Sequence, residues 1–442
     1  MISILTVLII VALSYRFPIR IGWSILIMAP VLYSMGNLIL IGDAFFPLRF
    51  QQIISAVSFG LVLSAKYRFL FFRGVRKSQP VLIFLLFLVM SILYGLTELR
   101  IGFFKLALLH DFPSYIAGLI VVFCLIKTEK ELQYFQVILI ISAFVIAVLA
   151  LVELFYSFNI AHYLCQSNAS FCDIKSQHFY STGVGSGGET VSIGIERGER
   201  YAGHAGQPNL TAILLAMFMV FIFVPLRSYT RTGYTYLLYI PLLVFCLMLL
   251  YLSQVRAAIF AFLIIFCIIS LNNRKVLIVG VTILIASLLA FLFIQEFREW
   301  TLYFIQNRLS GGVFDEQRIR GLVKLSQLYV DSFPFGVGGN IGYVLDELLV
   351  SDDASAFLLY FAVSLPLGLI YLALNFMLVY DLIVRKRFVR SKNHRWMIYL
   401  SALSILLGII TQIFNENGIL FYLILIYGAA RASTLNIQQQ KL

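Results

Sequence analysis

The chain has 442 residues, of which 61% are hydrophobic and only 12% are charged, a composition that excludes a soluble globular domain. Lys and Arg outnumber Asp and Glu by 33 to 21, giving a formal net charge of +12. Most of these basic residues lie in short stretches between apolar runs, which argues against nucleic-acid binding and is typical of the cytoplasmic loops of a membrane protein.

Apolar runs of nearly the length needed to cross a hydrocarbon core of ~30 Å recur along the chain. In chain order, the predicted spans are residues 21–41, 48–65, 80–96, 113–126, 134–158, 208–226, 236–252, 257–271, 276–294, 356–379, 396–414 and 419–430. Residues 1–14 are apolar but short for a full crossing, and they show no clear signal-peptide cleavage site. We therefore expect an all-α polytopic membrane protein with about 12 or 13 transmembrane helices.

Two long polar segments interrupt these spans, and the charge pattern places both on the extracytoplasmic side. They divide the chain into five predicted segments, namely residues 1–158, 159–207, 208–294, 295–355 and 356–442. The second loop contains apolar residues at helical spacing over 319–330, which predicts an amphipathic helix. Basic stretches at 66–77 and 385–395 are expected to face the cytoplasm.

The cysteines fall into two groups. Cys165 and Cys172 lie in the first polar loop, where we expect them to form a disulfide if that loop faces an oxidising compartment. Cys124, Cys246 and Cys267 lie inside apolar runs and are interpreted as inert core residues.

The first loop ends in a cationic, glycine-containing segment that runs directly into an apolar span. It carries Arg200, Gly203 and His204, and then Pro208 and Asn209. Proline suits the first turn of a helix, because its missing N–H would be unsatisfied there. The free N–H groups and positive dipole end of such a helix favour an anionic ligand. An exposed turn before a membrane helix is the simpler alternative.

Further arginines lie at other predicted extracytoplasmic positions. Arg256 is in a tight turn between two spans, and Arg318 and Arg320 are in the second loop. The guanidinium fork pairs well with phosphate oxygens, so convergence of several arginines would suit a pyrophosphate. Snorkelling of Arg256 to the membrane interface is the alternative explanation. Glu153, near the outer end of a span, is either a functional acid or a helix-boundary residue.

The residue pattern predicts neither a metal site nor a nucleotide site. The five histidines are scattered, and no carboxylates stand at ligand spacing from them. No glycine-rich phosphate loop of the nucleotide-binding type is present. We therefore expect no cofactor and no metal.

Three segments, taken in their order and membrane positions, resemble the O-antigen ligase/polymerase family. They are Arg200-x-x-Gly203-x-x-Gly206-Gln-Pro208-Asn209, Ser253-Gln-Val-Arg256-Ala, and Arg318 followed by Pro334-Phe-Gly336-Val-Gly338. The resemblance covers residues 200–369, which is under half of the chain, and its specificity comes from the order of three motifs that are each short.

This resemblance implies a GT-C-like membrane glycosyltransferase of the bacterial inner membrane, with its active site facing the periplasm. The implied donor and acceptor are glycans on undecaprenyl pyrophosphate, and a chain-length regulator is a further expected partner. Arginines at the positions of Arg200, Arg256 and Arg318, with Arg320 nearby, would hold the pyrophosphate.

One departure from the family pattern distinguishes the polymerase from the ligase. Ligases of this family carry a His-Asn pair just before the helix that follows the second loop, whereas residues 351–355 here read Ser-Asp-Asp-Ala-Ser. The resemblance is therefore greatest to an O-antigen polymerase acting in lipopolysaccharide biosynthesis. Asp352 or Asp353 is the candidate base for the acceptor hydroxyl, with His204 as the second candidate.

Three interpretations remain open from the sequence. The first is a polymerase that transfers the growing glycan to a new lipid-linked repeat unit with inversion at the anomeric carbon. The second is a ligase that transfers glycan to lipid A core through another base. The third belongs to a different class, a flippase or transporter of lipid-linked sugars, which would need polar residues along a passage through the helix bundle.

Overall fold

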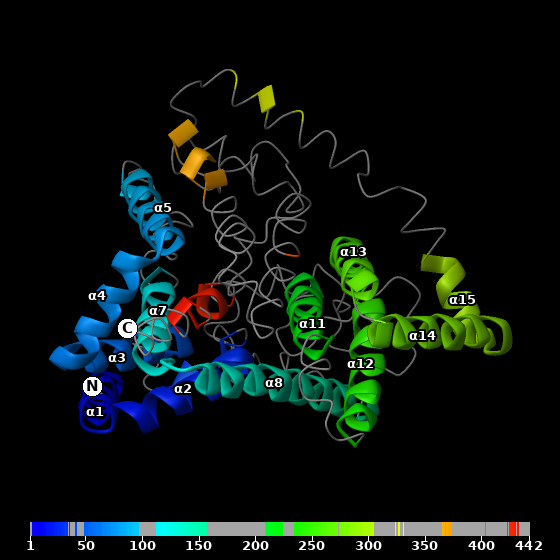
Figure 1. Ribbon diagram of the computed structural model, residues 1–442, viewed down its shortest axis with the longest axis horizontal. Helices are drawn as coiled ribbons and strands as arrows, with labels where there is room; N and C mark the ends of the chain where they lie inside the picture. Colours follow the sequence, from blue (N-terminus) through cyan, green and yellow to red (C-terminus); the bar gives the residue numbers. More distant parts are fainter. Residues whose placement is uncertain are drawn as a thin grey trace. The chain divides into compact units, whose positions relative to one another are not determined.

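The protein is predominantly helical and is described by a computed structural model (Figure 1). The described residues are 2–33, 35, 40–41, 48–96, 112–156, 208–223, 234–253, 255–272, 274–304, 323, 326–327, 330, 365–366, 368–370, 372–373, 403, 422, 424–429 and 431–432. The chain forms two compact units, the first from Met1–Leu139 with Gln317–Leu442 and the second from Ile140–Glu316.

The described part of the first unit includes α1 (Ile2–Arg16), α2 (Pro18–Leu32), α3 (Phe50–Leu63), α4 (Ala65–Lys77), α5 (Gln79–Leu96) and α7 (Phe112–Leu125). Helix α8 (Glu129–Tyr156) continues from the first unit into the second. The second unit contains α11 (Pro208–Phe223), α12 (Tyr234–Leu252), α13 (Arg256–Asn272), α14 (Arg274–Phe293) and α15 (Gln295–Phe304).

Helix α3 is the centre of the first unit and packs against α1, α2, α4 and α7. Gly60 allows the backbones of α1 and α3 to approach closely, because a Cβ atom at that position would lie 2.6 Å from the carbonyl oxygen of Val11. Gly22 of α2 leaves room for a side chain of α7, since a Cβ atom there would lie 2.6 Å from Cδ1 of Leu125. Small residues at these positions therefore set how tightly the helices pack.

Two pairs of consecutive helices are sharply bent. The α1–α2 pair turns by 119° around Phe17, where Pro18 opens the new helix, and the α3–α4 pair turns by 107° around Ser64. Among the described residues, one helix (Lys130–Ala150) is long and apolar enough to cross a membrane, and the number reaches three if each bent pair counts as one span.

Residues near the C-terminus complete the core of the first unit. The buried Tyr422 donates a hydrogen bond to the carbonyl oxygen of Pro30 at 3.0 Å, and its ring meets that of Tyr33 edge-on at 5.9 Å. Tyr33 in turn shares a hydrogen bond of 2.6 Å with Ser114 at the start of α7. Pro30 is among the last four residues of α2, whose carbonyls lack partners within the helix, so Tyr422 caps this end.

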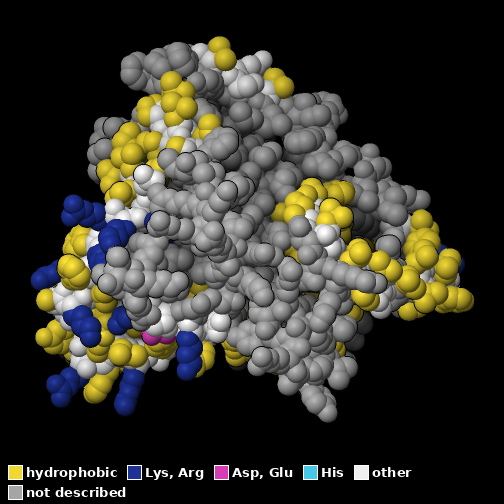
Figure 2. Space-filling model, in the orientation of Figure 1, with side chains coloured by type: hydrophobic (Ala, Val, Ile, Leu, Met, Phe, Trp, Pro, Cys, Tyr) yellow, Lys and Arg dark blue, Asp and Glu magenta, His cyan; other side chains and the backbone are white. Residues whose placement is uncertain are grey.

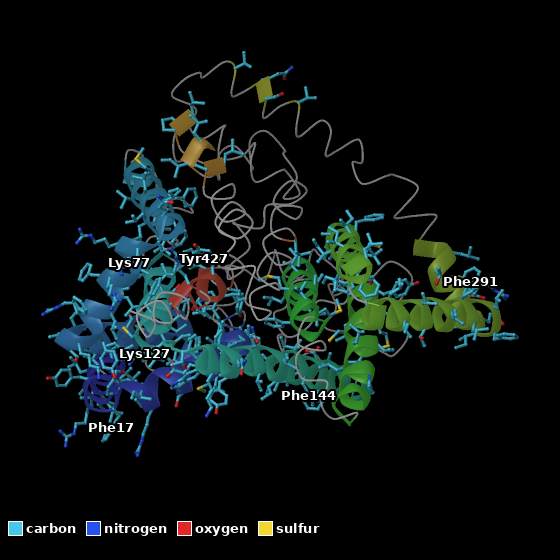
Figure 3. The ribbon with its side chains drawn as sticks, viewed as in Figure 1. Phe17, Lys77, Lys127, Phe144, Phe291 and Tyr427 are labelled. Atoms are coloured by element: carbon cyan, nitrogen blue, oxygen red, sulfur yellow. The ribbon has the colours of Figure 1, made fainter. Side chains whose placement is uncertain are left out.

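A second group of contacts fastens the end of α4. Arg431 donates a hydrogen bond from Nη2 to the carbonyl oxygen of Lys77 at 2.8 Å, and Ser78 and Tyr427 are 3.5 Å apart through their hydroxyl oxygens. The Lys127 ammonium lies 5.6 Å from the centre of the Tyr67 ring. Lys77, Tyr427 and Lys127 are labelled in Figure 3, where they can be followed from their three segments.

Helix α11 is the most buried element of the second unit and packs against α12 and α13. Its residues from Thr211 to Val220 are all buried, so this helix is enclosed on every side. Helix α14 packs against α13 and α15 but leaves apolar side chains exposed over most of its length, including Ile278, Ile285 and Leu292.

Several sequence predictions require correction at the level of secondary structure. The predicted span over 21–41 is not one helix, because α2 ends at Leu32 and a two-residue strand, β1 (Leu40–Ile41), follows. This strand pairs antiparallel with β2 (Leu48–Arg49), Ile41 opposite Leu48, so the described chain is not purely α-helical. The basic stretch 66–77, for which no helix was predicted, forms the helix α4. Cys267 is exposed on α13 and not in the core, whereas Cys124 and Cys246 are buried as expected.

Candidate functional site

Two of the three motif segments enter helices of the second unit at the predicted positions. Helix α11 begins with Pro208 and Asn209, and α13 begins with Arg256. The other predicted site residues lie outside the described residues: Arg200, Gly203, His204, Arg318, Arg320, Pro334, Gly336, Gly338, Asp352 and Asp353. The same is true of Cys165 and Cys172. Convergence of the arginines on one cavity therefore stays a prediction.

The turn before Arg256 is built from local hydrogen bonds. The Ser253 amide donates to the carbonyl oxygen of Leu249 at 2.9 Å, and the Ser253 hydroxyl donates to that of Leu250 at 2.6 Å. Both bonds satisfy carbonyls at the end of α12, which have no partner further along that helix. The Ile259 amide donates to Val255, so helical hydrogen bonding in α13 starts at that residue.

The two helix N-termini belong to elements that contact each other. Helices α11 and α13 pack together in the second unit, with α12 against both. Each N-terminus has backbone N–H groups without intrahelical acceptors and the positive end of a helix dipole. Within this unit the fold thus combines two features that favour anions, at the two segments where the sequence also supplies Arg200 and Arg256.

The start of the second predicted loop is attached to the same region. It forms the helix α15, in which Thr301 accepts a hydrogen bond of 3.2 Å from the Tyr251 hydroxyl in the last turn of α12. Tyr251 precedes the Arg256 turn by a few residues, so α15 lies beside that turn. Residues 295–304 belong to the predicted second loop, although an alternation of polar and aromatic residues is visible in the letters QEFREWTLYF.

Arg298 is a candidate cation that the sequence analysis missed. It is exposed on α15 and stands three residues before Thr301, a spacing that puts the two side chains on neighbouring positions of one helix face. The signal that could have identified it is the amphipathic pattern of α15.

In the predicted helix over 319–330, the described residues Val323, Ser326, Gln327 and Val330 are helical.

Glu153 is a buried acid in the second unit. It lies near the end of α8, with 5% of its surface exposed. Carboxylates are rarely buried in apolar helices unless they pair with another group or have a function. Glu153 does interact with another group, so its burial agrees with a structural role as well as with a functional one.

No group of three or more His, Cys, Asp and Glu residues that could hold a metal ion occurs in the part of the chain that the structure describes. No protein-family model matches this chain, and no curated protein or solved structure is similar to it.

Proposed function

We propose that this chain is a membrane glycosyltransferase that polymerises oligosaccharide repeat units carried on undecaprenyl pyrophosphate. The observation that carries the proposal is the start of α11 at Pro208 and of α13 at Arg256, two packed helices in one unit. Two of the three resembling motifs thus end at helix N-termini, where an anionic leaving group would be stabilised. The third motif, from Arg318 to Gly338, rests on the sequence alone.

The contacts of the first unit support the orientation that the proposal needs. Arg431, Lys77 and Lys127 belong to chain segments that the charge pattern assigns to the cytoplasm, and contacts join them through α4. Ser114 is at the outer end of the predicted span 113–126, and it is hydrogen-bonded to Tyr33, which lies in the outer half of the predicted span 21–41. Contacts between ends assigned to opposite sides would have contradicted the topology.

In the proposed reaction, an acceptor hydroxyl oxygen attacks the anomeric carbon from the face opposite the pyrophosphate. The new carbon–oxygen bond forms as the bond to the pyrophosphate oxygen breaks, and the electron pair leaves with the pyrophosphate. Arg200, Arg256 and Arg318 stabilise this developing charge, and the helix N-termini add fixed dipoles. The hydroxyl proton passes to Asp352, Asp353 or His204.

Arg256 is the residue on which the proposal is tested most directly. With purified full-length protein and lipid-linked repeat units, we expect Arg256→Ala to lower the rate of polymer formation by roughly 100-fold, the size of effect seen when a charge-stabilising group is lost. Arg256→Lys should also be poorly active, because an ammonium cannot replace the guanidinium fork. Arg16→Gln, at an exposed arginine of α1, is the matched control. Full polymer length in both Arg256 variants would refute the assigned role.

The glycan profile of a deletion strain separates the three classes of function. A polymerase defect leaves single repeat units attached to lipid A core, and a ligase defect leaves polymer on the carrier lipid. A flippase defect leaves single repeat units on the carrier at the cytoplasmic face. Only the first profile agrees with the proposal.

The identity of the base is tested by conservative variants. We expect one of Asp352→Asn and Asp353→Asn to bind lipid-linked glycan normally but transfer it slowly, because the charge is lost while the size is kept. If both variants polymerise at the normal rate while His204→Ala abolishes transfer, the base belongs to the first loop.

A further inference from the structure

Helix α4 differs from the apolar helices around it in composition and direction. Its sequence AKYRFLFFRGVRK contains five basic residues and no acidic ones. The 107° bend at Ser64 sends it away from the axis of α3, which is apolar. If α3 stands upright in a bilayer, α4 therefore lies close to the plane of the membrane, along about 20 Å at 1.5 Å per residue.

Packing fixes which face of α4 points outward. Tyr67, Phe71, Gly74 and Val75 are buried, and a Cβ atom at Gly74 would lie 2.4 Å from Cδ1 of Phe123 in α7. The Tyr67 carbonyl accepts a hydrogen bond from the Cys124 thiol at 3.5 Å. These contacts hold α4 against α7, so the helix cannot rotate to hide its other face.

The outward face combines aromatic rings with cations. Phe69 and Phe72 are 64% and 60% exposed. Around them on the helix surface stand four exposed basic residues, namely Lys66, Arg68, Arg76 and Lys77. Figure 2 shows Lys and Arg side chains interleaved with hydrophobic ones over the part of the first unit that contains α1 to α4. Neither water nor a purely hydrocarbon environment suits such a face.

Arg73 adds a polar group that is not satisfied by the residues the structure describes. Its Nη2 atom is buried and makes no hydrogen bond within the described part of the chain. Buried guanidinium N–H groups are normally paired, so the acceptor of this one is expected beyond the described residues, and a lipid phosphate would suit it. Arg73 lies four residues from Phe69 and three from Arg76, on the same side of the helix.

We propose that the outward face of α4 binds anionic phospholipid at the membrane boundary. Phe69 and Phe72 enter the upper acyl region, and the basic residues bind headgroup phosphates, with Arg73 as the innermost contact. The basic charge selects anionic over zwitterionic lipid. A second copy of the chain is disfavoured as the occupant, because a two-fold contact would set two rows of like charges against each other. The proposal requires membrane insertion but not the transferase activity.

The test uses the full-length protein with Phe69 replaced by the photo-crosslinking residue benzoylphenylalanine. The protein is placed in nanodiscs containing equal amounts of phosphatidylglycerol and phosphatidylcholine, and crosslinked lipid is identified by mass spectrometry. We expect phosphatidylglycerol to exceed phosphatidylcholine by roughly threefold or more, with the excess falling as salt is added. The matched control places the same residue at Leu288, which is 57% exposed on α14 and lies in an apolar run. It should crosslink both lipids equally.

A charge variant separates headgroup recognition from simple lipid contact. Combining Arg68→Gln, Arg73→Gln and Arg76→Gln should leave lipid crosslinking at position 69 but reduce the ratio to about one. Arg76→Gln alone, at an exposed position, should reduce the excess partially and serves if the triple variant does not fold. Equal crosslinking of both lipids by the starting protein would overturn the proposal. So would an unchanged excess in the charge variants, or crosslinking to a protein instead of lipid.

Discussion

Helices α4 and α14 both expose large hydrophobic side chains, yet their exposed faces differ in kind. The exposed face of α14 is apolar from Leu277 to Phe293, and its exposed Thr282 hydroxyl is hydrogen-bonded to the carbonyl oxygen of Ile278 at 3.0 Å. Such a surface suits a hydrocarbon environment, where each polar group must be satisfied internally. Helix α4 mixes Phe69 and Phe72 with exposed basic residues, which suits the boundary between lipid and water. Exposure alone thus does not reveal the environment, but the polar groups between the exposed apolar residues do.

The largest difference between the two helices should appear when an arginine is introduced into the exposed face of each. We expect Ile285→Arg in α14 to reduce insertion, because an arginine at the centre of a membrane helix costs about 2.5–3.5 kcal/mol. Phe72→Arg in α4 should insert normally, since the new charge reaches headgroups. Both side chains are about equally exposed, at 52% and 60%. The measurement is the amount of full-length protein in the membrane fraction, and similar losses for both variants would contradict the distinction.

The glycines of the two helices should respond differently to the same substitution. A Cβ atom at Gly74 would meet the body of the buried Phe123 ring, at 2.4 Å from Cδ1, whereas one at Gly280 would meet the tip of the less buried Phe266 ring, at 2.5 Å from Cζ. The tip can swing away more easily. We expect Gly74→Ala to lower the free energy of unfolding by about 2 kcal/mol and Gly280→Ala to lower it by under about 1 kcal/mol. Thermal unfolding in one detergent compares them, and an equal shift would show that α4 is packed no more rigidly than α14.

The C-terminal attachment of α4 gives a third, smaller effect. Arg431 is 7% exposed and donates a hydrogen bond to the last carbonyl oxygen of α4. The end of α14 has no such attachment among the described residues, because that helix continues into α15 through Ile294, whose amide donates to the carbonyl oxygen of Ala290. We expect Arg431→Gln to cost about 1.5 kcal/mol, the typical loss for a hydrogen bond to a charged group. Arg298→Gln, at an exposed arginine of α15, should change stability little. If unfolding temperature is unaffected by Arg431→Gln, this hydrogen bond does not hold α4.

The smallest expected effect concerns Lys127. Burial, and more weakly the neighbouring Cys124, raise the pKa of the Tyr67 hydroxyl, so at pH 7 the ring is neutral and Lys127 contacts its π face. We expect Lys127→Gln to lower the free energy of unfolding by about 0.5 kcal/mol, as for other partly exposed cation–π pairs. Lys130→Gln, which removes a pair with the exposed Tyr134 ring, should cost less. The reverse order in denaturant unfolding would exclude the Tyr67 contact as a stabilising one.

The limits of helices that are flanked by polar or turn residues were predicted well from the sequence. The predicted limits 80–96 and 236–252 fall within two residues of α5 (Gln79–Leu96) and α12 (Tyr234–Leu252), because polar or turn residues stand at their ends. The start of α11 was predicted from Pro208, because the missing N–H of proline is tolerated best in the first turn. These features are local, so the sequence reports them directly.

The bends and the role of α4 could not be obtained from hydropathy in the same way. Pro18 was an available signal for the bend at Phe17, but Ser64 makes no side-chain cap and offers no comparable local cause. The outward face of α4 is set by the fit of Gly74 against Phe123, a contact between residues far apart in the sequence. For the candidate site, the two helix starts follow from local chemistry, whereas convergence of the arginines depends on the tertiary arrangement.

The hydrogen bond between Tyr422 and Pro30 has a consequence for the order in which the protein matures. The first unit is assembled from both ends of the chain, and the second unit is the continuous segment between them. While the ribosome is still making the C-terminal residues, α2 lacks the hydroxyl that caps its end, and α4 lacks Arg431. The second unit can therefore complete its packing during synthesis, but the first must wait until residues 422–431 have been made. In a chain truncated before Tyr422, α2 would stay without this hydrogen bond, although it is made before the second unit.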